Sequence, residues 1–120
     1  MTTRFDLVLR NGTVVTPAGR LGVDVGVVGE RICAIGDLSR ADTAETFDAT
    51  GLHVLPGVID TQCHFREPGF PQKEDLGSGS ASGALGGVTG FFEMPNTNPS
   101  TDSAERLAWK VQRAKETAWV

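Results

Sequence analysis

The most informative segment of the chain is residues 54–69, Val-Leu-Pro-Gly-Val-Ile-Asp-Thr-Gln-Cys-His-Phe-Arg-Glu-Pro-Gly. It begins as an apolar run and becomes polar without a turn signal, which is typical of a buried strand that ends in a polar loop. Side chains alternate between the two faces of a strand, so every second residue is expected on one face. On that face lie Asp60, Gln62, His64 and Arg66. Burying polar groups without partners is unfavourable, so this cluster indicates a binding site.

The composition narrows the classes of function. The 120 residues are 39% hydrophobic, which is enough for a globular core, and they carry a formal net charge of -4. The chain therefore lacks the basic surface that binds nucleic acid. No apolar run approaches the ~20 residues that cross a bilayer, and no signal-peptide pattern is present. Cys33 and Cys63 form no Cys-x-x-Cys motif. We interpret them as free thiols of a cytoplasmic protein.

Residues 1–52 are predicted to form a small β-sandwich segment. Short runs with alternating apolar residues indicate strands at residues 5–10, 13–16, 23–27, 31–35 and 45–48. The dipeptide Asn11-Gly12 predicts a hairpin between the first two runs. Residues 17–19 and Gly29-Glu30 predict further turns. Short strands at this spacing predict a small antiparallel sheet or sandwich.

Residues 53–120 are predicted to contain the strand of the opening stretch and then a helix over residues 77–87. That segment is rich in glycine, and each glycine disfavours a helix by ~1 kcal/mol relative to alanine, so a flexible linker is the alternative. The helical interpretation relies on small residues that allow close packing on a sheet. Its packing side is expected to hold Leu76, Ala81, Ala84 and Leu85.

A second β/α unit follows. Residues 88–94 predict a strand, and Asp102 with Glu105 three residues later predicts the start of a helix over residues 103–116. The apolar positions at helical spacing are Ala104, Leu107, Ala108, Val111 and Ala114. Residues 118–120 predict the start of a third strand. This order implies parallel βαβ units, in which binding residues lie at the C-terminal ends of the strands.

Three motifs carry a family resemblance. They are Pro-Gly-Val-Ile-Asp-Thr-x-x-His-Phe-Arg-Glu-Pro-Gly, Gly-Gly-Val-Thr and Met-Pro-Asn-Thr. Together they resemble the dihydroorotases of the amidohydrolase superfamily, close to the allantoinases and hydantoinases. The resemblance implies an α/β fold, in which residues 53–120 are the first two β/α units of a (β/α)8 TIM-type barrel. Such a barrel needs ~250 residues, so we expect the 120 residues alone to lack hydrolase activity.

The resemblance also implies a zinc site. The family pattern is Asp-x-His-x-His with both histidines binding metal; Asp60 and His64 match it, whereas Gln62 occupies the first histidine position. The resemblance places the remaining ligands and the general base beyond Val120, so no catalytic residue is expected here. Without that context, a lone histidine such as His64 is more often a surface or core residue than a metal ligand. An amide oxygen is a poorer zinc ligand than imidazole, so Gln62 implies either one metal in place of two or a homologue without catalysis.

Arg66 and Asn96 are the candidate substrate-binding residues. The planar guanidinium of Arg66 suits a carboxylate, and the resemblance implies that Asn96 helps to hold the same group. An ion pair with a nearby acidic residue is the alternative for Arg66. A purely structural turn between prolines is the alternative for Asn96.

Three functions follow from these observations. The resemblance implies a hydrolase of cyclic amides like dihydroorotase, acting in pyrimidine biosynthesis, with hydantoinase- or allantoinase-type ureide hydrolysis as its alternative. The second is a non-catalytic dihydroorotase-like scaffold for aspartate carbamoyltransferase. The third is an unrelated small α/β binding module. The family also implies a homo-oligomer, and neither nucleic acid nor membrane is an expected partner.

Overall fold

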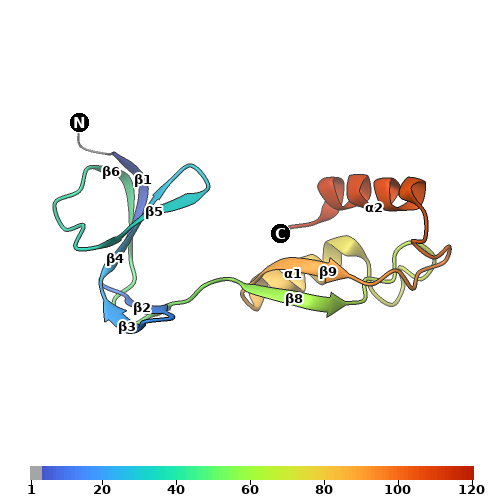
Figure 1. Ribbon diagram of the computed structural model, residues 1–120, viewed down its shortest axis with the longest axis horizontal. Helices are drawn as coiled ribbons and strands as arrows, with labels where there is room; N and C mark the ends of the chain where they lie inside the picture. The colour runs from blue at the N-terminus through green and yellow to red at the C-terminus, as the bar shows by residue number, and fades with distance from the viewer. Residues whose placement is uncertain (1–3) are drawn as a thin grey trace. The chain divides into compact units, whose positions relative to one another are not determined.

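The computed structural model describes residues 4–120. The chain divides into two compact units, with the boundary between Pro56 and Gly57 (Figure 1). The boundary expected from the sequence lay after residue 52. The structure places it later because β7 (His53–Val54) pairs in parallel with β2 (Thr13–Thr16) of the first unit. Within residues 4–120, both helices are too short or too polar to cross a bilayer.

The first unit consists of two sheets. The larger has the strand order β5-β4-β1-β6, and the smaller has the order β3-β2-β7. The remaining strands of this unit are β1 (Phe5–Arg10), β3 (Gly19–Gly22), β4 (Asp24–Val28), β5 (Arg31–Gly36) and β6 (Thr43–Asp48). The predicted antiparallel pairing holds for β1–β4, β2–β3 and β4–β5, whereas β6 pairs in parallel with β1 and β7 in parallel with β2. The strand β3 was not predicted.

The predicted hairpin at Asn11-Gly12 is also wrong. The strands on either side of it, β1 and β2, belong to different sheets. Asn11 adopts a left-handed φ of 62°, and a Cβ at Gly12 would lie 2.9 Å from Cγ2 of Val54. The dipeptide therefore connects a strand of one sheet to a strand of the other, at a position where the surrounding atoms are closely packed. The turn predicted at Gly29 is confirmed, since β4 and β5 pair antiparallel across it.

The second unit begins with two β/α units. Its strands β8 (Val58–Cys63) and β9 (Val88–Glu93) pair in parallel, and Figure 1 shows them side by side. They are followed by α1 (Leu76–Leu85) and α2 (Ala104–Thr117) respectively. The predicted βαβ order is confirmed. Residues 118–120 form no strand, and the backbone N–H of Trp119 instead donates to Oγ of Ser80 at 3.1 Å.

Glycines explain how α1 packs. A Cβ at Gly79 would lie 2.5 Å from Cδ1 of Phe65, and a Cβ at Gly83 would lie 2.9 Å from Cε1 of Phe91. The two phenylalanine rings meet edge to face with centroids 5.0 Å apart. The helix is thus confirmed and the linker alternative is wrong. The predicted packing side is only partly correct, because Leu76 is buried but Leu85 is 93% exposed.

The N-termini of the two helices differ from expectation in detail. Asp75 caps α1, with Oδ1 accepting from the backbone N–H of Ser78 at 2.6 Å. The cap of α2 is Ser103, one residue after the predicted Asp102, whose carboxylate pairs with Arg106 instead. The apolar positions of α2 are mostly exposed within this chain, and its only buried residue is Lys110.

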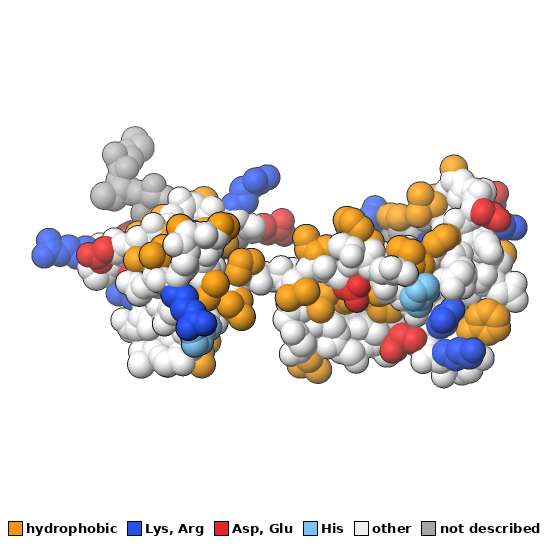
Figure 2. All heavy atoms as spheres, turned by 60° about the horizontal axis from the view of Figure 1, so that its bottom comes forward, with side chains coloured by type: hydrophobic (Ala, Val, Ile, Leu, Met, Phe, Trp, Pro, Cys, Tyr) orange, Lys and Arg blue, Asp and Glu red, His pale blue; other side chains and the backbone are white. Residues whose placement is uncertain are grey.

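Several apolar side chains of β8 and β9 are exposed in the second unit. Val58, Ile59 and Phe92 are each more than half exposed, and Figure 2 shows hydrophobic side chains at the surface of this unit. The expectation of a buried apolar strand therefore does not hold for residues 58–59.

Candidate functional site

Two loops meet at the C-terminal ends of the parallel strands. The first follows Cys63 at the end of β8, and the second follows Glu93 at the end of β9. The backbone N–H of Met94 donates to the Cys63 carbonyl at 2.9 Å, and the N–H of Asn98 donates to the Pro68 carbonyl at 3.1 Å. Parallel topology thus brings the polar ends of both strands together, as the sequence predicted.

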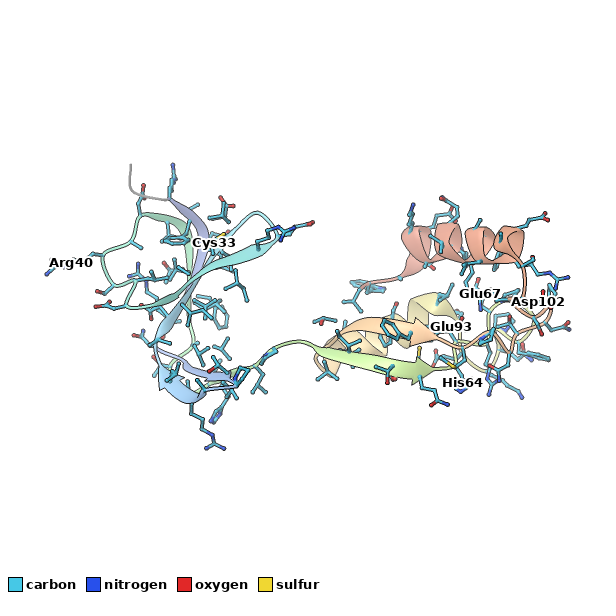
Figure 3. All side chains as sticks on the ribbon, in the orientation of Figure 1. Cys33, Arg40, His64, Glu67, Glu93 and Asp102 are labelled. Carbon is cyan, nitrogen blue, oxygen red and sulfur yellow. The ribbon has the colours of Figure 1, made fainter. Side chains whose placement is uncertain are left out.

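His64 and Asn96 are in direct contact. Nδ1 of His64 and Oδ1 of Asn96 are 2.8 Å apart, although the residues are 32 positions apart in the chain. Both side chains are exposed, and Figure 3 shows His64 at the end of β8. The candidate metal ligand and a candidate substrate-binding residue therefore belong to one hydrogen-bonded pair.

Asp60 and Gln62 lie on β8 itself. The carboxylate of Asp60 accepts a hydrogen bond from the backbone N–H of Gln62 at 2.9 Å. The amide side chain of Gln62 is exposed, and Asp60 is half-buried. Because β8 ends at Cys63, the strand alternation that was expected to align Asp60 with Arg66 does not extend past this point.

Arg66 lies in the loop after β8. Its backbone N–H donates to the Glu74 carbonyl at 2.9 Å, and its own carbonyl accepts from Phe70 at 2.8 Å, so the main chain here is well anchored. The half-buried guanidinium forms no ion pair with any residue between 4 and 120. The ion-pair alternative for Arg66 is therefore not formed within the described residues.

Glu67 is a structural residue that the sequence analysis did not single out. Its buried carboxylate accepts from Nε of Arg113 at 2.6 Å and from the backbone N–H of Leu76 at 3.1 Å. This interaction raises the pKa of Arg113. One carboxylate thus joins the Arg66 loop, the start of α1 and the middle of α2. The Arg-Glu dipeptide alone did not reveal this, because the partner lies 46 residues away.

A second buried ion pair lies behind the loops. Nζ of Lys110 is 2.6 Å from Oε2 of Glu93, at the end of β9, and the side chains are only 8% and 13% exposed. Lys110 lies on α2 and not at the end of a strand. Its role here is to pair with a carboxylate that would otherwise be buried alone.

The chain offers only part of a zinc site. No three His, Cys, Asp or Glu side chains within residues 4–120 come close enough together to hold a metal ion. His64 fits as a ligand, since its exposed Nε2 is free of any hydrogen bond within the described range. Gln62, the other candidate ligand, would add one weak oxygen donor. Zinc takes about four ligands, so these donors do not form a complete site.

Burial raises the pKa of the Cys63 thiol to about 11, and the carboxylates of Asp60 and Glu93 act in the same direction. The raised value means that the folded chain holds this thiol neutral until the pH approaches 11. At pH 8 it should therefore have about 100-fold less thiolate than an ordinary thiol, and thiolate is the reactive form.

We expect iodoacetamide at pH 8 to label the exposed Cys33 while Cys63 stays largely unmodified. Peptide mass spectrometry measures both rates in one sample, and labelling in denaturant provides the control in which the difference disappears. Equal labelling of the two thiols in the folded chain would contradict the raised pKa.

Comparisons with known proteins agree with the motifs. A family model described as dihydro-orotase-like matches residues 51–120. A dihydroorotase of Bacillus pumilus is 44% identical over 113 residues, which cover 93% of this chain and 26% of that protein. An allantoinase of Deinococcus radiodurans is 38% identical over 117 residues, covering 97% of this chain and 26% of the relative.

A solved structure gives the same result. The L-hydantoinase (dihydropyrimidinase) of Arthrobacter aurescens superposes with a TM-score of 0.80 at 32% identity, covering 92% of this chain and 25% of that one. The chain thus spans about a quarter of the length of the relatives that it matches.

Proposed function

The chain belongs to the dihydro-orotase-like family of amidohydrolases, and from this premise we propose that its protein hydrolyses a C–N bond of a cyclic amide, with dihydroorotate as the substrate. We further propose that β8, α1, β9 and α2 are the first two units of a (β/α)8 barrel, with the first unit of the chain as its β-sandwich segment. In this arrangement the loops after β8 and β9 face the substrate.

One observation carries the proposal. The loops after two parallel strands bring Nδ1 of His64 and Oδ1 of Asn96 within 2.8 Å of each other. Arg66, two residues after His64, has no ion-pair partner within residues 4–120. This contact supports the proposal that an imidazole able to bind metal lies beside Asn96, a candidate partner of the substrate carboxylate. A cyclic amide that carries a carboxylate meets both requirements.

The substrate preference follows from Arg66. Its guanidinium presents two parallel N–H donors to a carboxylate, and the amide N–H groups of Asn96 add a further donor. A charged ring such as dihydroorotate is favoured over an uncharged cyclic ureide, because only the charged ring satisfies the free guanidinium. Ureide hydrolysis, as the names of the allantoinase and hydantoinase relatives suggest, is the less favoured alternative.

Zinc, when bound, would activate water and polarise the ring carbonyl. In this chain Nε2 of His64 and the amide oxygen of Gln62 are the proposed donors, and Asp60 supports them from β8. We place the other ligands and the general base outside residues 4–120. The 120 residues alone are accordingly proposed to be inactive.

Gln62 favours a second candidate function. A neutral amide oxygen in the first ligand position weakens zinc binding, and a protein of this family without zinc would act through its surface. The candidate is a non-catalytic scaffold, with aspartate carbamoyltransferase as its partner. In either case we propose a cytoplasmic homo-oligomer.

The deciding experiment measures intact mass, bound metal and dihydroorotate turnover on the purified natural gene product. Zinc together with turnover would support the hydrolase. Absence of both would support the scaffold. A verified chain of 12.7 kDa that turns over a cyclic amide would contradict the proposal that these residues alone are inactive.

Replacement of Arg66 by alanine is expected to raise the KM for dihydroorotate about 10- to 100-fold, because a hydrogen bond to a charged group contributes about 1.5–3 kcal/mol. The matched control is Arg20→Ala on β3 of the first unit, which should leave KM unchanged. Steady-state kinetics over a range of substrate concentrations measures the effect. An unchanged KM in the Arg66 variant would remove that residue from the substrate site.

A further inference from the structure

We infer that Asn96 has a second role besides the substrate binding already proposed: its Oδ1 orients the His64 imidazole, while its Nδ2 stays free for the substrate carboxylate. The second part rests on the proposed function. The first part rests on geometry within the chain alone, and it makes Asn96 a positioning residue for the candidate metal ligand.

The hydrogen bond determines which ring nitrogen of His64 carries the proton. A carboxamide oxygen only accepts, so the 2.8 Å contact requires Nδ1–H as the donor. A neutral imidazole has one N–H, and Nε2 therefore retains its lone pair. No residue between 4 and 120 bonds to Nε2, and the side chain is exposed. Metal-ligating histidines characteristically donate their other N–H to an oxygen in this way.

The other end of the Asn96 side chain has no such partner. Nδ2 carries two N–H donors and makes no hydrogen bond to any residue between 4 and 120. The orientation that serves His64 therefore leaves both donors free. An incoming carboxylate is an acceptor only, and it matches these donors and the guanidinium of Arg66.

The loop around Asn96 is held rigidly from within. The carbonyl of Pro95 accepts from the backbone N–H groups of Thr97 and Thr101, each at 2.9 Å. The hydroxyl of Thr97, a buried residue, donates to the Pro99 carbonyl at 2.9 Å. These bonds fix the main chain on both sides of Asn96 without any metal or substrate. The orientation of His64 is thus prepared by the fold.

The test of orientation uses nitrogen NMR on the 120-residue chain, without metal, at an alkaline pH where imidazole is neutral. The chain has two histidines, and His53 of β7 is the internal reference. We expect His64 to be protonated on Nδ1. Asn96→Asp keeps the acceptor and should keep that tautomer, whereas Asn96→Ala should shift it towards Nε2–H. A wild-type His64 protonated on Nε2 would overturn the inference.

The same variants separate the two roles in the natural gene product. Asn96→Ala should lower zinc affinity about 10- to 100-fold, as expected for loss of a bond that orients a ligand, and should also raise KM. Asn96→Asp should raise KM while zinc affinity stays near the wild-type value. Equal zinc affinity in the wild type and Asn96→Ala would overturn the positioning role. If the tautomer is as expected but dihydroorotate is not turned over, only the proposed function fails.

Discussion

Replacement of Lys110 by methionine is expected to lower the free energy of unfolding of the second unit by about 3–5 kcal/mol, the usual effect of removing one partner of a buried ion pair. Lys110 is only 6% exposed, and it donates to Oε2 of Glu93 at 2.6 Å. The other oxygen, Oε1, is already buried without a hydrogen-bond partner. Methionine would therefore leave a carboxylate buried with no partner on either oxygen.

The measurement is urea unfolding followed by tryptophan fluorescence. Both tryptophans of the chain, Trp109 and Trp119, lie in the second unit, so the signal reports on that unit alone. Lys115→Met, at an exposed position of the same helix, is the matched control and should change stability by less than about 0.5 kcal/mol.

A double variant tests the electrostatic explanation. Glu93→Leu combined with Lys110→Met replaces both charges by apolar groups, and such replacements are often neutral or stabilising. We expect the double variant to recover most of the lost stability. If Lys110→Met unfolds at the same urea concentration as Lys115→Met, the buried pair is not important for stability.

Replacement of Gly79 by valine is expected to destabilise the second unit by about 3 kcal/mol, at the upper end of the usual range for overpacking. A Cβ at this position would lie 2.5 Å from Cδ1 of Phe65 and 3.1 Å from Cγ of Glu74. Phe65 is buried and packs edge to face on Phe91, so displacing its ring would disrupt that contact.

Gly77→Ala is the control within the same helix. The nearest atoms to a Cβ at Gly77 are Oδ1 of Asp75 at 3.4 Å and the Thr117 carbonyl at 3.5 Å, which are ordinary contacts. Here alanine gains helix propensity without a clash, so stability should rise by up to ~1 kcal/mol. Equal effects of the two substitutions would show that α1 does not pack closely on Phe65.

The elements of the second unit were largely predictable from the sequence. The helix over residues 103–116 was identified from apolar residues at helical spacing, and the strand over 88–94 from an apolar run; both signals are local. The side of a helix that packs against its neighbours was less predictable. The packing side of α1 is formed partly by Gly79 and Gly83, because the phenylalanine rings occupy the space that side chains would need. Patterns of apolar residues do not show where close packing requires a glycine, which has no side chain.

In the first unit, local sequence signals were less able to predict which strands pair. Asn11-Gly12 is a good hairpin signal, yet the strands on either side of it find parallel partners about 40 residues later in the chain. Such pairings depend on which strand edges remain available once the sheets assemble. No short segment of sequence contains that information.

From the sequence alone, the family resemblance and the βαβ order of residues 57–120 were predictable, and His64, Arg66 and Asn96 could be proposed as site residues. These features reside in residue types and short spacings, which local rules and motifs can detect. Only the tertiary structure decided that Asn96 bonds to His64, that Arg66 has no ion-pair partner within residues 4–120, and that Glu67 and Glu93 pair with Arg113 and Lys110. The physical reason is that hydrogen bonds and ion pairs act over about 3 Å in space, whereas these partners are 17 to 46 residues apart in the chain.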